Sequence, residues 1–467
     1  MIGNCNLIGV ISKGRLAKGF LFVQSMQSLR DQQLMLHIMK SFRTQLTKAL
    51  LLSCLTFGMV LPTYGKLEEG VDTLVNFNGK NGSQPQSILE DSHGNFYGTT
   101  LSGGAYGQGT VFEIQQDGKL ITLVSFSGAN GSGPEAGVIL DKDGNLYGTT
   151  KTGGANGKGT IFKITPDGKF STLASFDGKN GSQPTSGLLL GPDGSIFGST
   201  EGGGANGKGT IFKVTPDGKM TTMVSFDGTN GADPGSLVHG DDGNFYGTTN
   251  KGGPNGKGLV FKLTPDGKLT TLLAFDGKNG SFPNSGLVKT EDGVLYGTTQ
   301  DGGPGGQGTA YSVTTEGKFR NVIAFNGVNG SHPDSGLTEW SNGYFYMVGL
   351  WNNMLIKSAK VQWAGANFCG TTSGGGVNGF GTVFRMGDDG TLVTLVSFTG
   401  SKGIDLGISP NSLVPGQDGN LYGTTGSGGY HGLGTVFRLQ LQTWLLPVEG
   451  VSTGGQSGQI TLPIVSP

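Results

Sequence analysis

Cysteine is scarce in this chain, with three residues among 467. Two of them, Cys5 and Cys54, lie before residue 66, in a segment that we expect to be removed on export. Cys369 alone would then remain, which excludes an intrachain disulfide and any metal site built from several thiolates. We therefore expect stability to come from packing, and we predict neither a metal nor a cofactor.

The sequence also lacks a positive net charge and an apolar run of membrane length. Seven of the 32 basic residues and one of the 33 acidic residues lie before residue 66, so the remainder carries a net charge of −7. An acidic surface does not favour nucleic acid, whose phosphates are neutralised by Lys and Arg. The apolar run at residues 49–61 has 13 residues, whereas a spanning helix needs about 20. We expect no nucleic-acid partner and no stable membrane span after signal cleavage.

Residues 39–65 have the pattern of a secretory signal peptide. Lys40, Arg43 and Lys48 precede the apolar core, and a Pro-Thr-Tyr-Gly string ends it at a small residue. This pattern predicts an extracytoplasmic protein that is secreted, periplasmic or at the cell surface. Residues 1–38 match nothing downstream, and we interpret them as an extension from a start codon assigned too early. Residues 442–467 form a C-terminal tail in which we find no anchor.

Glycine is abundant, with 90 residues in 467 against a usual share of roughly 7 %. It does not recur at every third position, and proline contributes only 18 residues, so the chain is not a collagen. Glycine weakens helix interiors by about 1 kcal/mol relative to alanine. The composition therefore predicts strands and turns.

A Tyr-Gly-Thr-Thr string recurs at intervals of about 50 residues, as expected for repeat architectures. Each copy contains four short segments rich in β-branched and aromatic residues, separated by turns such as Pro192-Asp193-Gly194. Four strands per repeat of this length indicate a propeller blade. The string lies at residues 97–100, 147–150, 246–249, 296–299 and 422–425, with variants at 197–200 and 369–372.

The two ends of the repeat region complement each other. The segment at residues 71–77 matches the fourth strand of a blade, and the last copy lacks a fourth strand. We predict an all-β, seven-bladed β-propeller over residues 71–441, closed when this N-terminal strand completes the last blade. An irregular segment at 347–366 is an insertion, a decayed repeat or the product of a frameshift. The blades begin near Pro85, Pro134, Pro184, Pro234, Pro283, Pro333 and Pro410.

The strings at residues 96–112 and 421–437 resemble the Gloeo_Verruco (GloVer) tandem repeat. They share Tyr-Gly-Thr-Thr, a Gly-Gly pair and a closing Gly-Thr-Val-Phe. The resemblance covers residues 71–441 and implies an exported bacterial repeat protein without an assigned biochemical role.

Two glycine-rich strings resemble ligand-binding loops but lack essential elements. At residues 153–160 a glycine separates Lys158 from Thr160, and a strand rather than a helix is expected to follow, unlike in a phosphate-binding loop. At residues 141–145 the spacing of Asp141 and Asp143 resembles the start of a calcium loop, but no Glu closes it. We interpret both strings as turns.

Polar loops such as residues 176–184 (FDGKNGSQP) recur around the expected ring, and their Asn-Gly-Ser strings are interpreted as turns. The histidines His93, His239, His332 and His431 are scattered over different repeats, although one rim could gather His93, His239, Asp91 and Asp241. We predict a monomeric binding or structural propeller that recognises an extracellular glycan or a protein through its polar loops. The alternative is a propeller enzyme, a hydrolase or lyase acting on extracellular polysaccharide or lactone. An enzyme requires convergent titratable groups in one place, so no catalytic or metal-binding residue is assigned.

Overall fold

The computed structural model describes residues 71–340, 344–351, 354–362, 366–400 and 407–440. Within these ranges the chain forms thirty β-strands and no helix, and hence no helix that is long and apolar enough to cross a membrane. The predicted extension at 1–38, the signal peptide at 39–65 and the tail at 442–467 lie outside the described residues.

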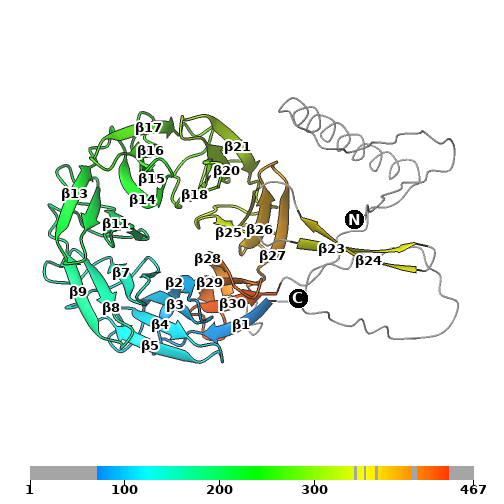
Figure 1. The fold of residues 1–467 in the computed structure, drawn as a ribbon, viewed down its shortest axis with the longest axis horizontal. Helices are drawn as coiled ribbons and strands as arrows, with labels where there is room; N and C mark the ends of the chain where they lie inside the picture. Colours follow the sequence, from blue (N-terminus) through cyan, green and yellow to red (C-terminus); the bar gives the residue numbers. More distant parts are fainter. Residues whose placement is uncertain (1–70, 341–343, 352–353, 363–365, 401–406, 441–467) are drawn as a thin grey trace, which may run out of the picture. The chain divides into compact units, whose positions relative to one another are not determined.

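Seven four-stranded antiparallel sheets form the blades of a propeller arranged around a ring (Figure 1). The fold class and the number of blades are therefore as the repeat predicts. The first three blades consist of β2 (Ser83–Glu90), β3 (Phe96–Ser102), β4 (Thr110–Ile114) and β5 (Leu120–Ser125); of β6 (Ile139–Leu140), β7 (Leu146–Thr150), β8 (Thr160–Ile164) and β9 (Phe170–Ser175); and of β10 (Leu189–Leu190), β11 (Ile196–Thr200), β12 (Thr210–Val214) and β13 (Met220–Ser225).

The remaining blades repeat the same order. They consist of β14 (Ala232–His239), β15 (Phe245–Lys251), β16 (Leu259–Leu263) and β17 (Leu269–Ala274); of β18 (Val288–Lys289), β19 (Leu295–Thr299), β20 (Thr309–Val313) and β21 (Phe319–Ala324); of β22 (Thr338–Glu339), β25 (Asn367–Thr372), β26 (Thr382–Gly387) and β27 (Leu392–Ser397); and of β28 (Gly407–Pro415), β29 (Leu421–Gly428), β30 (Thr435–Leu439) and β1 (Val71–Asn76).

The ring closes through the pairing of β1 with β30, which lie side by side in Figure 1 at the blue and orange-red ends of the chain. Val71 is opposite Leu439 and Asn76 is opposite Thr435. Arg438 donates a hydrogen bond to the Asp72 carboxylate at 2.6 Å, and Phe77 is fully buried beyond the end of the strand. The N-terminal strand thus completes the seventh blade, as the sequence predicts.

The recurring Tyr-Gly-Thr-Thr string is explained by packing between the second and third strands. A Cβ atom added to Gly148 would lie 2.5 Å from the Phe162 ring, so only glycine leaves room for the aromatic side chain. The last threonine of the string pairs with the threonine that opens the third strand, as in Thr150 and Thr160 with 2.8 Å between their Oγ1 atoms. The same glycine–aromatic contact occurs at Gly98, Gly198, Gly247, Gly297, Gly370 and Gly423.

The first strands come in two lengths, which the sequence reasoning did not foresee. A long first strand was expected at residues 184–190, but β10 comprises only Leu189 and Leu190. The blades with short first strands have one additional residue between the blade proline and the strand, as at Gly187. A residue without a partner on the neighbouring strand interrupts the hydrogen-bond ladder between the two strands, so the first strand starts later. Blades one, four and seven lack the additional residue and have first strands of eight or nine residues.

The irregular segment contains a two-stranded hairpin of β23 (Tyr344–Trp351) and β24 (Met354–Gln362). It lies in the chain between β22 and β25, which pair directly with each other through Thr338 and Cys369. Because blade six is complete without the hairpin, the extra residues form an insertion between its first two strands.

Candidate binding site in the central channel

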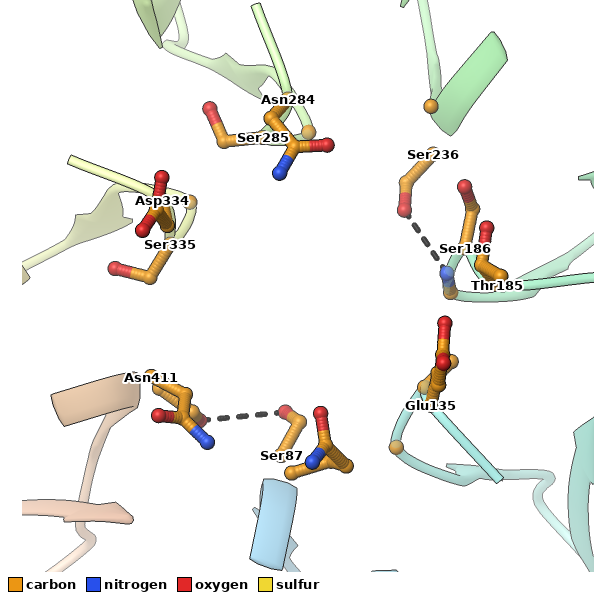
Figure 2. Close-up of a pocket in the computed structure, with 18 of the residues that line it drawn as sticks. Ser87, Glu135, Thr185, Ser186, Ser236, Asn284, Ser285, Asp334, Ser335 and Asn411 are labelled. Carbon is orange, nitrogen blue, oxygen red and sulfur yellow. Dashed lines mark hydrogen bonds between the residues drawn. The ribbon is translucent and has the colours of Figure 1, made fainter. Parts of the chain in front are cut away.

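A cavity of about 1010 Å³ is lined by residues in or just before the first strand of each of the seven blades, together with residues at or just beyond the ends of several second strands. Figure 2 shows labelled side chains from each blade arranged around this space. Because an equivalent proline lies in or shortly before the first strand of every blade, the residues that follow these prolines form successive layers of the wall.

Serine occupies the second position after the blade proline in six of the seven blades, with Ala136 in the other. Ser87 and Ser412 lie 3.3 Å apart across a blade boundary, and Ser236 accepts a hydrogen bond from the amide of Gly187 at 3.0 Å; both contacts are dashed in Figure 2. The wall is thus a polar ring of hydroxyl groups. The serines are Ser87, Ser186, Ser236, Ser285, Ser335 and Ser412.

The position directly after the proline differs in most blades. It introduces two carboxylates, Glu135 and Asp334, together with amide, hydroxyl and glycine residues. The mouth of the channel is therefore asymmetric although the blades are nearly alike elsewhere. The set is Gln86, Glu135, Thr185, Gly235, Asn284, Asp334 and Asn411.

Ion pairs hold three of the carboxylates that line the cavity. Lys151 lies 3.0 Å from Glu135 and 3.7 Å from Glu201, and Lys251 lies 3.2 Å from Asp233. Burial lowers the pKa of Lys151, but the hydrogen bond and charge of Glu135 outweigh this effect, so the pKa is raised. Lys151 therefore stays protonated.

A further group of titratable side chains lies where blades five and six meet. His332 Nδ1 is 2.9 Å from Asp301 Oδ1. The neighbouring Asp334 accepts a hydrogen bond from Ser373 through Oδ2 at 2.6 Å, whereas its Oδ1 is buried and has no hydrogen-bond partner among the described residues. Burial raises the pKa of the Asp334 carboxyl.

The residue before the blade proline adopts a left-handed backbone in all seven blades, with φ between 50° and 61°. Such a conformation costs about 1–2 kcal/mol for a residue with a Cβ atom. In each blade the amide of this residue donates to a carbonyl of the preceding blade, as His332 does to Gln307 at 3.0 Å. These bonds hold neighbouring blades together and fix the mouth. The seven are Gln84, Gly133, Gln183, Asp233, Phe282, His332 and Ser409.

The loops that join second to third strands lie beside the connections between blades. Gly104 donates to Gly79 at 2.8 Å, for example, and we call the surface formed by these two sets of loops the loop face. Tyr106 and Tyr430 are 65 % and 74 % exposed in this face, on blades one and seven. Asn156 and Asn206 occupy the place of Tyr106 in blades two and three. The loop face therefore has an aromatic sector next to the closure of the ring.

The two strings that resemble ligand-binding loops have structural roles. Residues 153–160 connect β7 to β8, and their four glycines all have positive φ. Asp141 accepts hydrogen bonds from the amides of Asp143 and Asn145 and from the Tyr147 hydroxyl, so its carboxylate is used within the turn. Across the described part of the chain, no group of three or more His, Cys, Asp and Glu side chains is placed to hold a metal ion.

The polar rim loops and the remaining histidines also form local contacts. Asn180 and Asp177 cap each other's backbone amides at 2.9 Å. His93, in blade one, lies 3.7 Å from Asp91. His239, in blade four, packs against Phe245 of the same blade. Of the four histidines beyond the signal, His332 is the one that lies beside a cavity-lining carboxylate. Sequence reasoning missed the serine ring, although a Ser two residues after six of the seven blade prolines was its signal.

The sequence model of the Gloeobacter/Verrucomicrobia repeat matches residues 63–238 and 156–355. No curated protein matches the chain.

Solved propellers resemble the fold at low sequence identity. A catalytically inactive virginiamycin B lyase from Staphylococcus aureus with quinupristin is 17 % identical, with a TM-score of 0.50, over 80 % of this chain and 99 % of that one. The extracellular domain of a hybrid two component system from B. thetaiotaomicron is 12 % identical, with a TM-score of 0.49, over 79 % and 39 % of the two chains. A gluconolactonase from Xanthomonas campestris is 14 % identical, with a TM-score of 0.39, over 79 % and 88 %.

Proposed function

The chain belongs to the Gloeobacter/Verrucomicrobia repeat family, and we propose that it is an exported propeller that binds a glycan at the mouth of its central channel. The observation that carries this proposal is the cavity of about 1010 Å³ with hydroxyl, amide and carboxylate groups in its wall. Ligand pockets commonly have volumes of about 300–1,000 Å³.

The chemistry of the wall favours a polyhydroxylated ligand over an apolar one. The hydroxyl groups of Ser285 and Ser335 already bond to Thr298 and Thr371. The side chains directly after the blade prolines, such as Thr185 and Asn284, offer a ligand groups that donate and accept hydrogen bonds, and burying them against an apolar ligand would leave them unsatisfied at a cost of about 1–3 kcal/mol each. The exposed rings of Tyr106 and Tyr430 add flat apolar surfaces with a polar edge on the same face. A sugar presents both hydroxyl groups and apolar C–H surfaces, and so matches both features.

Binding is tested by screening the exported protein on a glycan array and measuring affinities of positive ligands by calorimetry. We expect Thr185→Ala combined with Asn284→Ala, two cavity-lining residues that are not buried, to weaken binding on the order of tenfold, because each lost hydrogen bond contributes about 0.5–1.5 kcal/mol. Ser171→Ala, on an exposed outer strand, is the matched control and should bind normally. Binding by none of the glycans, or equal binding by both variants, contradicts the proposal.

The aromatic sector is tested separately. Tyr430→Ala should leave the unfolding midpoint unchanged, because the side chain is 74 % exposed, but should weaken binding of an oligosaccharide several-fold. Tyr430→Phe retains the ring and should bind as the parent does. Equal affinities for Tyr430→Ala and the parent would exclude the sector from the site.

We also propose an extracytoplasmic location, supported by the signal pattern at residues 39–65. Cell fractionation with N-terminal sequencing tests it, and a cytoplasmic protein that retains residues 39–65 contradicts it.

A second candidate function is an enzyme acting on polysaccharide or lactone. The observation that favours it is the proximity of His332, Asp301 and Asp334 at one side of the mouth, since such groups serve in acid–base catalysis. Mass spectrometry of oligosaccharides and lactones incubated with the protein tests it. His332→Gln should abolish any turnover while preserving the fold, because Gln84 and Gln183 occupy the same position in blades one and three.

A further inference from the structure

The carboxylates that line the cavity outnumber the cations that neutralise them. Glu135 and Glu201 share the single ammonium group of Lys151. Asp233 is paired with Lys251, at 3.2 Å. The channel wall therefore carries unbalanced negative charge, and a low-dielectric concave wall strengthens its field.

Asp334 is the cavity-lining carboxylate that has no Lys or Arg within 4.0 Å among the described residues. The nearby His332 lies against Asp301, at 2.9 Å. Ser373 donates a neutral hydrogen bond to Asp334 Oδ2, the Gln300 side chain also favours the ionised carboxylate, and Oδ1 has no donor within 3.5 Å among the described residues. A buried acceptor without a donor is destabilising, so a donor supplied by a ligand would satisfy a requirement that the protein itself leaves open.

We propose that a cationic amine of the bound ligand pairs with Asp334, so that the ligand is an amino sugar or an oligomer of amino sugars. This inference rests on the proposed glycan-binding function and specifies its substrate class. Because Oδ1 is shielded in the ligand-free protein, the pairing requires a turn about the last side-chain bond of Asp334, which has broad rotational freedom. This turn moves both oxygens, so Ser373, which now bonds to Oδ2, and the amine then each donate to one of them. The polar side chains after the other blade prolines, such as Thr185 and Asn284, hold the rest of the sugar.

The repeat supplies a substitution that isolates the carboxylate charge. Blade six reads Pro-Asp-Ser-Gly-Leu at residues 333–337, and blade five reads Pro-Asn-Ser-Gly-Leu at residues 283–287. Asp334→Asn therefore places in blade six a sequence that already folds in blade five. The reciprocal change, Asn284→Asp, adds a carboxylate at the equivalent position of the neighbouring blade.

The test compares two probes that differ at the amine: glucosamine oligomers with free amines, and N-acetylglucosamine oligomers of the same length and linkage. Calorimetry uses the exported protein at low ionic strength, at a pH below the pKa of the amines but above that of the Asp334 carboxyl, whose pKa burial raises, so that both groups are charged. We expect the free-amine oligomer to bind roughly tenfold to hundredfold more tightly, as charge-assisted hydrogen bonds predict. Asp334→Asn should remove this preference and leave the N-acetylated oligomer bound with unchanged affinity. Asn284→Asp should increase the preference, and added salt should reduce it.

The outcomes separate this inference from the function on which it rests. Equal affinity for both oligomers, or a preference that survives in Asp334→Asn, overturns the role of Asp334 while glycan binding stands. Failure of either oligomer to bind, together with a negative glycan array, overturns the proposed function itself. Circular dichroism of both variants, with the parent as reference, confirms that the ring has folded.

Discussion

The glycine of the Tyr-Gly-Thr-Thr string provides a sharp test of how the blades pack. In blade two, Gly148 has an ordinary backbone conformation, so alanine introduces only a methyl group and no strain in φ. That methyl would lie 2.5 Å from Cζ and 3.0 Å from Cε1 of Phe162, whereas ordinary van der Waals contacts are 3.4–4 Å. Phe162 is fully buried, and its ring must move by roughly an ångström in a close-packed core.

The expected cost of Gly148→Ala follows from this geometry. Inserting a methyl group into a well-packed core destabilises by about 1–3 kcal/mol, and the distance of 2.5 Å places this case near the upper end. Gly157 in the same blade is the matched control, with φ of +67° and no atom within 4 Å of an added Cβ. Gly157→Ala pays only the left-handed backbone cost of about 1–2 kcal/mol.

Urea unfolding followed by circular dichroism measures both variants. We expect a lower midpoint for Gly148→Ala than for Gly157→Ala. Adding Phe162→Leu to Gly148→Ala should recover part of the loss, since the smaller side chain leaves room for the methyl group and the two sites couple by roughly 0.5–3 kcal/mol. A Gly148→Ala protein as stable as the parent, or strictly additive effects in the double variant, would refute the packing account.

Three further predictions concern closure, acid stability and the thiol. Phe77→Ala should lower the free energy of unfolding by about 3–5 kcal/mol in urea, because the ring is fully buried where β1 closes the propeller. The control Lys80→Ala, at an exposed position, should change it by less than about 0.5 kcal/mol. A small effect of Phe77→Ala would contradict closure by β1. The hydrogen bond from the Ser195 amide makes the largest contribution to lowering the pKa of Asp193 from 3.8 to about 2. The ionised Asp193 therefore stabilises the fold fully above pH 3.8, and this stabilisation is lost as the pH falls through about 2. Asp193→Asn should lose less stability than the parent across that interval in acid titrations. Burial raises the pKa of Cys369 to about 12, so peptide mapping should find it unmodified by iodoacetamide in the native protein and modified after denaturation; modification in the native state would contradict its burial.

The fold was predictable because the residues that build it recur. Gly148 must be small to admit Phe162, and Thr150 meets Thr160. Every blade repeats the glycine and an aromatic residue at nearly the same spacing, and all but blade four, which has Leu259, repeat the threonine pair. The repeat region starts with a single fourth strand and ends with a blade of three strands, and this match predicted closure. The pairing of β1 with β30 confirms it. The short first strands were missed, because the additional residue near Gly187 lengthens the interval from Pro184 to the Tyr-Gly-Thr-Thr position by only one residue, a change too small to indicate lost pairing.

The candidate site was not predictable by the same reasoning. Asp301 and His332 belong to different blades and are 2.9 Å apart only because the ring places those blades side by side. A search for compact motifs favours the rim loops, where Asn180 and Asp177 mainly satisfy each other. The cavity wall instead combines a few residues from each blade, and no local sequence pattern indicates which of these residues face one another across the channel.

The distribution of differences among the blades is itself an argument about function. Seven identical blades would create a symmetric channel, in which no position could orient an asymmetric ligand. In this chain the packing positions remain nearly constant, while the position after the blade proline changes from Glu135 to Asn284 to Asp334 around the mouth. A change there costs the fold little, because the blade cores are built from other residues. The mouth of the channel is therefore where this scaffold distinguishes one blade from another, and Asp334, whose Oδ1 has no hydrogen-bond partner among the described residues, is the strongest of those distinctions.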